Sequence, residues 1–161
     1  MTSSDDLLSD ERLTALGLLE ETRAGLHERF ATQLATHGLA ELDFEVLLRL
    51  GRSPHARLRM SDLASQVNMS ASGLTRVVDR LESAELVARV SCREDRRGTW
   101  ATVTEAGFAR LQAALPGHLE LIQQWYVGVL GPDEIAELTR LLRKLRDVVR
   151  PQAVAGAAPS D

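Results

Sequence analysis

The chain of 161 residues contains one cysteine, Cys92, and one lysine, Lys144. With a single cysteine, no intrachain disulfide can form and no cysteine-based zinc cluster is possible. No apolar run approaches the roughly 18 residues that a membrane-spanning helix needs. The N-terminal stretch MTSSDDLLSDE has neither the basic start nor the apolar centre of a signal peptide. We therefore expect a cytoplasmic protein with no membrane partner.

The sequence patterns typical of enzymes and metal sites are also missing. No Gly-rich phosphate loop is present, and Ser72-Gly73 is neither framed by glycines nor preceded by a predicted strand, as a nucleophile elbow would be. A zinc site could be built only from scattered residues such as His37, Glu41 and His118, because no HxxxH pair exists. We predict no enzymatic activity, no cofactor and no metal.

The charge is unevenly distributed along the chain. The formal net charge is -4, and arginine supplies all of the basic residues except Lys144. This excess, together with many alanines, indicates a GC-rich genome and says little about function. From Arg49 to Arg97, however, ten arginines face six acids, while the rest of the chain is strongly acidic. A basic middle within an acidic frame favours a local anionic partner.

Long helices are predicted near both ends. Apolar residues recur near a helical period at about 10–36 and again at about 105–130. Thr104 would cap the second of these helices, and Pro116 would kink it.

Shorter elements surround them. A helix is predicted at about 42–50 and a loop at 51–57. A last helix is predicted at about 133–149, where apolar residues alternate at spacings of three and four, as in a helix-packing seam. The tail at 151–161 is predicted to be disordered.

The middle of the chain has the pattern of a helix-turn-helix. A short helix is predicted at 60–67 with Ser61 as its N-cap, and a tight turn follows at Asn68 and Met69. The next helix starts after the N-cap Ser70, and its apolar face consists of Leu74, Val77, Val78 and Leu81. Two short helices joined by such a turn are typical of this motif.

A β-hairpin is predicted directly after the helix pair. The segments LVARVS (86–91) and TWATVT (99–104) are rich in β-branched residues. The stretch SCREDRRGTW joins them, and Gly98 can supply a turn conformation. By itself this stretch could be a solvated turn with a local ion pair, but after a helix-turn-helix it has the position of a wing.

These elements predict a mainly α fold with a small β-hairpin wing: a winged helix-turn-helix flanked by long dimerisation helices. The winged helix-turn-helix would span 41–104, and the helical dimerisation region 10–40 and 105–150. The central unit is too small to bury the apolar stripes of the flanking helices, so we expect a homodimer. The alternative is that all stripes pack within one chain.

From about 10 to 150 the chain resembles the MarR family of winged-helix transcriptional regulators. The resemblance rests on LRMSDLASQVNMSASGLTRVVDRLESAELVAR (58–89), REDRRG (93–98) and TEAG (104–107), in this order between long helices. It implies a dimer that presents two winged helices to double-stranded DNA, often released by a small molecule. One departure is Glu85, which stands where the family usually has glycine. If the backbone keeps positive φ there, glutamate costs about 1 kcal/mol.

The second helix of the motif would read DNA. Its outward residues are expected to be Ala71, Ser72, Thr75, Arg76, Asp79 and Arg80. The hydroxyls of Ser70, Ser72 and Thr75 can donate to phosphates or bases, and Gly73 lets the backbone approach closely. Arg76 is the candidate for a base contact, because arginine and guanine form the commonest specific pair. We expect Arg80 to contact a phosphate or to pair with Asp79.

In the wing, the resemblance implies that Asp95 orients Arg97 into the minor groove. Arg93 and Arg96 would then meet nearby phosphates. Cys92 lies at the base of the wing beside Arg93, which could lower the thiol pKa, so redox sensing is one alternative function. A winged-helix module that binds a protein partner is another, and ten arginines in the central segment argue against it.

An effector pocket is implied where the first, second and fifth helices meet. The candidate residues are His27, Phe30, Phe44, Leu47, Phe108 and Leu111. Such walls would suit an amphipathic or aromatic molecule, although each of these residues could equally be part of an apolar core.

Overall fold

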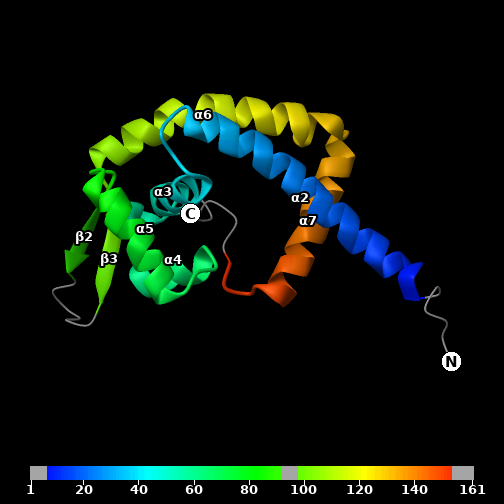
Figure 1. Ribbon diagram of the computed structural model, residues 1–161, viewed down its shortest axis with the longest axis horizontal. Coiled ribbons are helices and arrows are strands. Elements are labelled where there is room, and N and C mark those ends of the chain that lie inside the picture. Colours follow the sequence, from blue (N-terminus) through cyan, green and yellow to red (C-terminus); the bar gives the residue numbers. More distant parts are fainter. Residues whose placement is uncertain (1–6, 92–97, 154–161) are drawn as a thin grey trace.

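The structure, a computed structural model, describes residues 7–91 and 98–153 (Figure 1). The predicted fold class is confirmed: the chain is mainly helical and carries a small sheet. Its helices are α2 (Glu11–Ala35), α3 (Glu41–Gly51), α4 (Met60–Gln66), α5 (Ala71–Ser83), α6 (Glu105–Trp125) and α7 (Pro132–Val149). The strands are β1 (Arg57–Arg59), β2 (Val87–Ser91) and β3 (Thr99–Val103), and the short 3₁₀ helices are η1 (Pro54–Ala56) and η2 (Val127–Val129).

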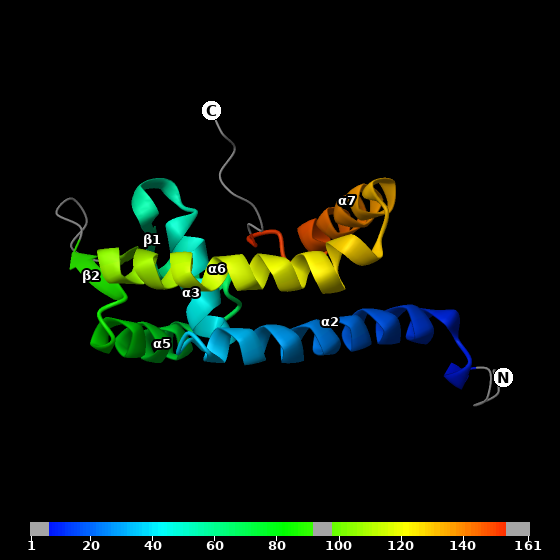
Figure 2. The ribbon, with the colours of Figure 1, turned by 90° about the horizontal axis from the view of Figure 1, so that it is seen from above.

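Two long helices form the frame of the molecule. Helices α2 and α6 run side by side in both ribbon views (Figures 1 and 2). The Gln33 Nε2 group donates to the Ala114 carbonyl at 3.0 Å, and the Arg110 guanidinium donates to the His37 carbonyl at 2.9 Å. At one end the pair carries α3, α4, α5 and the sheet, and at the other end α7 turns away from it (Figure 1).

The core lies where α3, α4, α5 and the sheet meet. Leucines from three helices are fully buried there, namely Leu47, Leu50, Leu63, Leu74 and Leu81. The inward face predicted for α5 is confirmed, because Val77 and Val78 are buried as well. This packing fixes α5, the helix expected to read DNA (the recognition helix), against α3, and the opposite face of α5 is left in solvent.

The sheet has the order β1-β3-β2 with both pairs antiparallel. Pairing of β2 with β3 extends from Val87 opposite Val103 to Ser91 opposite Thr99, so the predicted hairpin forms. Strand β1 departs from the sequence prediction, which gives a loop over 51–57. Three residues alternating arginine and leucine carry little strand signal, and only their register with Trp100 to Thr102 makes them a strand.

One predicted cap and one predicted helix end are wrong. Helix α4 begins at Met60, with Arg59 in the N-cap position, because the chain is in β1 up to that residue. The Ser61 hydroxyl therefore caps nothing and donates to the Asp62 carboxylate at 3.3 Å. Helix α6 continues through Pro116 but ends at Trp125, where the backbone leaves helical geometry at Tyr126 and η2 follows.

The junction between α5 and the wing is tightly built. The Glu85 amide donates to the Glu82 carbonyl and the Leu86 amide to the Leu81 carbonyl, both at 2.9 Å, which is a Schellman ending. Glu85 has φ 60°, so the left-handed conformation is kept although the residue is not glycine. The Thr104 hydroxyl donates to the Glu85 carbonyl at 2.6 Å and accepts from the Gly107 amide at 3.0 Å, which confirms Thr104 as the cap of α6.

Apolar side chains of the terminal helices lie in solvent. Helix α7 has no buried residue, and Leu145 and Val149 are 57% and 72% exposed. In α2 the leucines Leu13, Leu16, Leu18 and Leu19 are also exposed. A single chain therefore does not bury the apolar faces of its terminal helices, so the alternative in which all of them pack within one chain is wrong. Within the described ranges, no helix combines the length and the apolar character that crossing a membrane requires.

Candidate nucleic-acid interface

The N-terminus of α5 is built by a serine cap. The Ser70 hydroxyl accepts from the Gly73 amide at 3.1 Å, which confirms Ser70 as the N-cap. The Ser70 and Ser72 hydroxyls lie 3.2 Å apart and can share a hydrogen bond. A Cβ on residue 73 would lie 3.0 Å from the Met69 side chain and 3.1 Å from the Ser70 hydroxyl. Gly73 thus has a packing role in the cap, whatever it does toward DNA.

The outer face of α5 is polar, as the sequence predicts. Its exposed residues are Ala71, Ser72, Thr75, Arg76, Asp79 and Arg80. The Thr75 hydroxyl donates to the Ala71 carbonyl one turn back at 2.9 Å, so in this state it is occupied by its own helix. Arg76 is exposed in the middle of the helix, and no described residue forms an ion pair with it. Its contact with a base stays a prediction.

Arg80 does not pair with Asp79, the partner that the sequence suggests. Its guanidinium forms an ion pair with Asp43 of α3, a carboxylate only 7% exposed. The hydrogen bond to Asp43 raises the pKa of Arg80. Asp43 is also bonded by the Ala40 amide at 3.4 Å, at the start of α3. The sequence does contain a sign of this pair. Asp43 lies on the apolar side of α3, next to Phe44, and a carboxylate that is buried there needs a charged partner.

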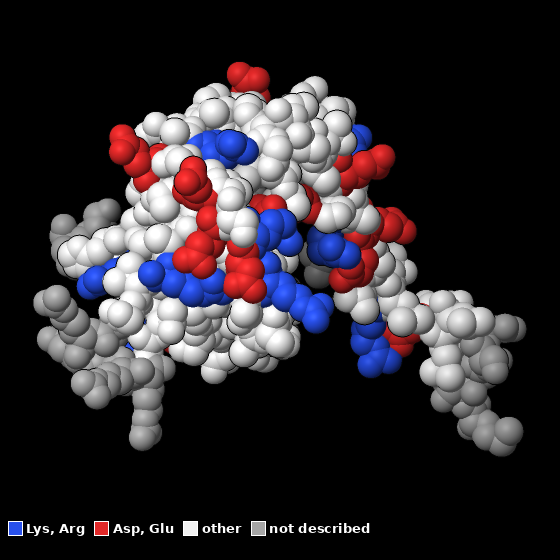
Figure 3. Space-filling model, turned by 60° about the vertical axis from the view of Figure 1, so that its left-hand side comes forward, with Lys and Arg blue, Asp and Glu red and all other residues white. Residues whose placement is uncertain are grey.

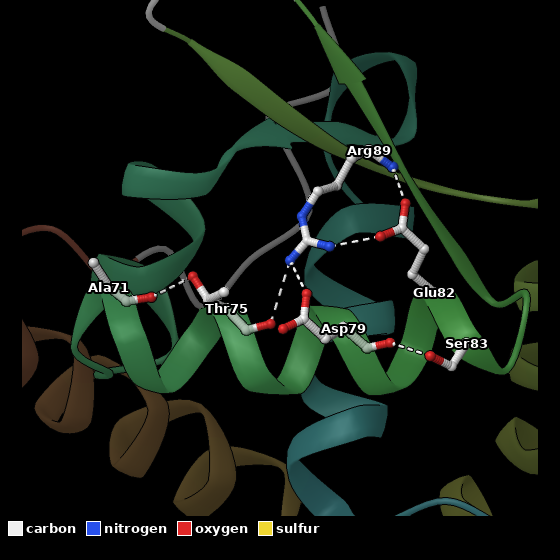
Figure 4. A network of polar contacts seen from close by, with 6 residues as sticks. All are labelled: Ala71, Thr75, Asp79, Glu82, Ser83 and Arg89. Carbon is white, nitrogen blue, oxygen red and sulfur yellow. Dashed lines mark hydrogen bonds and ion pairs between the residues drawn. The ribbon is translucent and has the colours of Figure 1, made fainter.

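The partner of Asp79 is Arg89 of β2, a residue that sequence reasoning did not single out. Its guanidinium contacts Asp79 at 2.6 Å, Glu82 at 2.5 Å and the Thr75 carbonyl at 3.3 Å (Figure 4). The Arg89 amide also donates to Glu82 at 3.0 Å. Desolvation opposes the charged form, but the bonds to Asp79 and Glu82 outweigh it and raise the pKa of Arg89. Arg89 thus ties the wing strand to the recognition helix.

The outer surface of the sheet carries a second basic group. The guanidiniums of Arg57 and Arg59 lie 5.0 and 5.4 Å from the centre of the Trp100 ring, a cation–π arrangement. On the face shown in Figure 3, arginine side chains form a band in which Asp and Glu are interspersed. Basic and acidic side chains are therefore mixed on this face.

The predicted tip of the wing lies outside the described residues. This applies to Arg93, Asp95, Arg96 and Arg97, and to Cys92, so their proposed roles stay predictions. What the structure does describe is a hollow of about 490 Å³ between α5 and the base of the wing. It is lined by Thr75 and Asp79 of α5, by Arg89, Gly98 and Thr99 at the base of the wing, and by Arg59, Met60 and Ser61.

The candidate pocket residues do not form one group. Phe44, Leu47 and Leu111 are buried in the core, whereas Phe108 is partly exposed. His27 instead forms an ion pair with Glu41 of α3. Burial is the largest influence on the Glu41 carboxyl and raises its pKa, and His27 opposes that rise.

A different histidine occupies the junction of α2, α3 and α6. The His118 ring lies between Phe30 and Phe44, with centroid separations of 4.7 and 4.6 Å. Burial lowers the pKa of His118. In the described part of the chain, its Nδ1 atom and the Oε1 atom of Gln33 are buried without a hydrogen-bond partner. No group of three metal-ligating side chains occurs among the described residues, so a site from His37, Glu41 and His118 does not assemble there.

Comparison with known proteins gives a consistent result. Residues 39–99 match the model of the MarR family. The structure is similar to that of AbsC, a MarR family transcriptional regulator from Streptomyces coelicolor, with 31% identity, a TM-score of 0.83, and 89% of this chain and 97% of that chain covered. The structure of Sco3205 from the same organism, determined in complex with DNA, gives 29% identity, a TM-score of 0.81 and coverage of 88% and 89%. The transcriptional repressor MdtR of Bacillus subtilis is 27% identical over 145 residues, with 90% and 89% covered.

Proposed function

This chain belongs to the MarR family of transcriptional regulators, and on that premise we propose that it is a repressor that binds a pseudo-palindromic DNA site as a homodimer and is released by a small effector. Its relatives are named as transcriptional regulators, so the prediction that it is not an enzyme is confirmed. We place it in the cytoplasm, where its DNA target would be.

The recognition helix carries the DNA-binding part of the proposal. Helix α5 buries its apolar face completely and exposes Ser72, Thr75 and Arg76 on the other. Such a face suits the major groove, where Arg76 can form a bidentate pair with guanine. The hollow between α5 and the base of the wing would lie along the DNA sugar–phosphate backbone that separates the major groove from the minor groove. Arg97 would then enter the minor groove, oriented by Asp95.

The dimer is supported by the surfaces that one chain leaves uncovered. Apolar residues are exposed in the N-terminal half of α2 and along α7, away from the end of the frame that carries the winged helix (Figure 1). Pairing with a second copy would remove them from water, and each square ångström of apolar surface so buried contributes roughly 25 cal/mol. A twofold dimer would read two half-sites about one helical turn, or roughly 10 bp, apart.

Effector release is supported by the junction around His118. The rings of Phe30 and Phe44 suit an aromatic molecule, the buried Oε1 atom of Gln33 needs a hydrogen-bond donor, and the buried Nδ1 atom of His118 needs a polar partner. Asp43, which holds Arg80 of the recognition helix, directly precedes Phe44 in α3. An effector that displaced Phe44 would thereby shift the support of Arg80 and weaken DNA binding.

Fluorescence anisotropy tests the regulatory function. The probes are labelled DNA from upstream of the chain's own gene and random DNA of equal length, each titrated across a salt series. We expect tighter binding to the upstream DNA and a steep loss of affinity with salt, because phosphate contacts release counterions. Arg76→Ala should reduce this preference, whereas Arg23→Ala, the same charge change on α2, should leave it unchanged. Equal and salt-insensitive binding of both DNAs would contradict the proposal.

The effector is tested on the same complex. Phenol and benzoate serve as minimal aromatic probes, one neutral and one anionic. The expected result is that one of them releases the DNA from the native protein and not from the His118→Phe variant, which fills the site without an acceptor. Release of DNA from both proteins alike would place the effector elsewhere.

A further inference from the structure

Helix α7 is joined to the winged helix by the segment that follows it. The helix itself buries no residue in the chain, yet the chain after Val149 turns back toward α4 (Figure 1). Residues 151–153, which the sequence assigns to a disordered tail, are described and form part of this connection. The contacts of this segment therefore decide how the dimerisation helix is placed relative to the DNA-reading unit.

Arg150 makes the central contact. Its Nη2 group donates to the carbonyl oxygens of Ser65 at 3.0 Å and Gln66 at 3.3 Å. These are the last residues of α4, and the Ser65 carbonyl also accepts from the Asn68 amide at 3.3 Å. A cation is favoured at the C-terminal end of a helix, and an arginine can bridge two carbonyls at once. The contact thus holds Arg150 at the C-terminal end of α4.

A second bond also joins the segment to α4, and a hollow lies between the segment and the start of α5. The Ser65 hydroxyl donates to the Gln152 side chain at 3.3 Å. A hollow of about 430 Å³ is lined on one side by Asn68, Met69 and Ser70 and on the other by residues 149–153. Ser70 is the N-cap of α5, so across this hollow the segment faces the end of the helix that would enter the groove.

We infer that Arg150 is a positioning residue, which holds the recognition helix at a set distance from α7 and thereby sets the half-site spacing that the dimer accepts. This inference rests on the proposed dimer and its DNA binding. If α7 lies at the twofold axis, the separation of the two recognition helices depends on how rigidly each winged helix is joined to its own α7. Successive base pairs are about 3.4 Å apart, so a shift of a few ångströms changes the preferred spacing.

Selection from a random-sequence DNA library tests the inference, because the library contains every half-site and spacing and no particular operator has to be chosen. The native protein, Arg150→Met, Arg150→Lys and Arg143→Met are each used to select sites, and the distance between paired half-sites is read by sequencing. Met keeps the aliphatic stem and removes the donors, while Lys keeps a charged donor. Arg143→Met is the matched control, because Arg143 is an exposed arginine of α7 outside the contact.

The native protein and the control should select one spacing. Arg150→Met should select sites spread over two or more spacings with the same half-site sequence, and Arg150→Lys should restore the single spacing. A variant that only destabilised the fold would select fewer sites at an unchanged spacing. One unchanged spacing with Arg150→Met would overturn the inference.

Hydrogen exchange on the DNA-free proteins separates this inference from the proposed function. We expect at least a threefold rise in exchange at residues 64–70 in Arg150→Met and no rise in Arg143→Met. If the native protein selected no paired sites, the proposed function would fail, and the exchange result would still decide whether the contact exists in solution. Unchanged exchange in Arg150→Met would show that Arg150 holds nothing there.

Discussion

Replacing Glu85 by glycine should stabilise the protein. Glu85 occupies the residue after the cap of α5 and has φ 60°, a conformation that costs an L-residue about 1–2 kcal/mol. Its backbone cannot relax, because its amide donates to Glu82 and its carbonyl accepts from Thr104 at 2.6 Å. The residue is exposed, and within the described ranges its carboxylate makes no hydrogen bond or ion pair. The side chain therefore brings the strain with no compensating contact.

The size of the effect follows from two opposing terms. Glycine removes the strain, but it also gives the unfolded chain more freedom, which costs about 0.4–1 kcal/mol. We expect Glu85→Gly to raise the free energy of unfolding by about 0.5–1 kcal/mol, or Tm by about 2–3 °C for a domain of this size. Glu85→Ala retains a Cβ and should change stability little, while Asn, which tolerates this conformation, should fall between the two.

Urea unfolding at one fixed protein concentration measures the effect, because the stability of a dimer depends on concentration. DNA affinity should be the same for all three variants, since the backbone conformation is unchanged. A Glu85→Gly variant no more stable than Glu85→Ala would refute the strain argument. A change in DNA affinity would show that the residue does more than end the helix.

Three further predictions concern the interface and the junction. Arg76→Ala should relax sequence preference by about 1–3 kcal/mol at one base position and reduce random-DNA binding less, as competition titrations would reveal; equal losses would make Arg76 a phosphate contact. Arg89→Met should destabilise the protein, because it removes both ion pairs, but only by about 1–2 kcal/mol, because the acidic partners are largely exposed and screened. Double-mutant cycles with Asp79→Asn and Glu82→Gln should show coupling of Arg89 to both residues, and purely additive effects would contradict these contacts. Burial lowers the pKa of His118 in the folded protein below the value of about 6.5 that histidine has in the unfolded chain. The unfolded state therefore binds more protons at acidic pH, and the free energy of unfolding should fall as pH drops from about 6.5 toward 5. A His118→Phe variant should lose that part of the pH dependence, and an unchanged pH dependence would show that His118 is not responsible.

Much of the interface could be predicted because local rules decide it. The spacing of apolar residues in α5 determines which side faces the core, so the outward set from Ser72 to Arg80 follows from helical geometry. Ser70 and Thr104 are recognisable as caps because a hydroxyl directly before a helix commonly accepts a hydrogen bond from a free amide of the first turn. Ser61 has the same local signal, but pairing of β1 with β3 moves the start of the helix. Local propensity gives way to a contact that is distant in the sequence.

The amino-acid sequence alone determined the order of elements, the polar face of the recognition helix, the position of the wing and the family resemblance, because these depend on periodicity and on residues close together in the chain. The tertiary structure decided which charges meet: Arg80 with Asp43, Arg89 with Asp79 and Glu82, and Arg150 with the end of α4. The partners in the first and last of these contacts are 37 and 85 residues apart. A long arginine side chain can reach many carboxylates or carbonyl groups. The spacing of residues along the sequence does not indicate which of these groups the fold brings within about 3 Å of it.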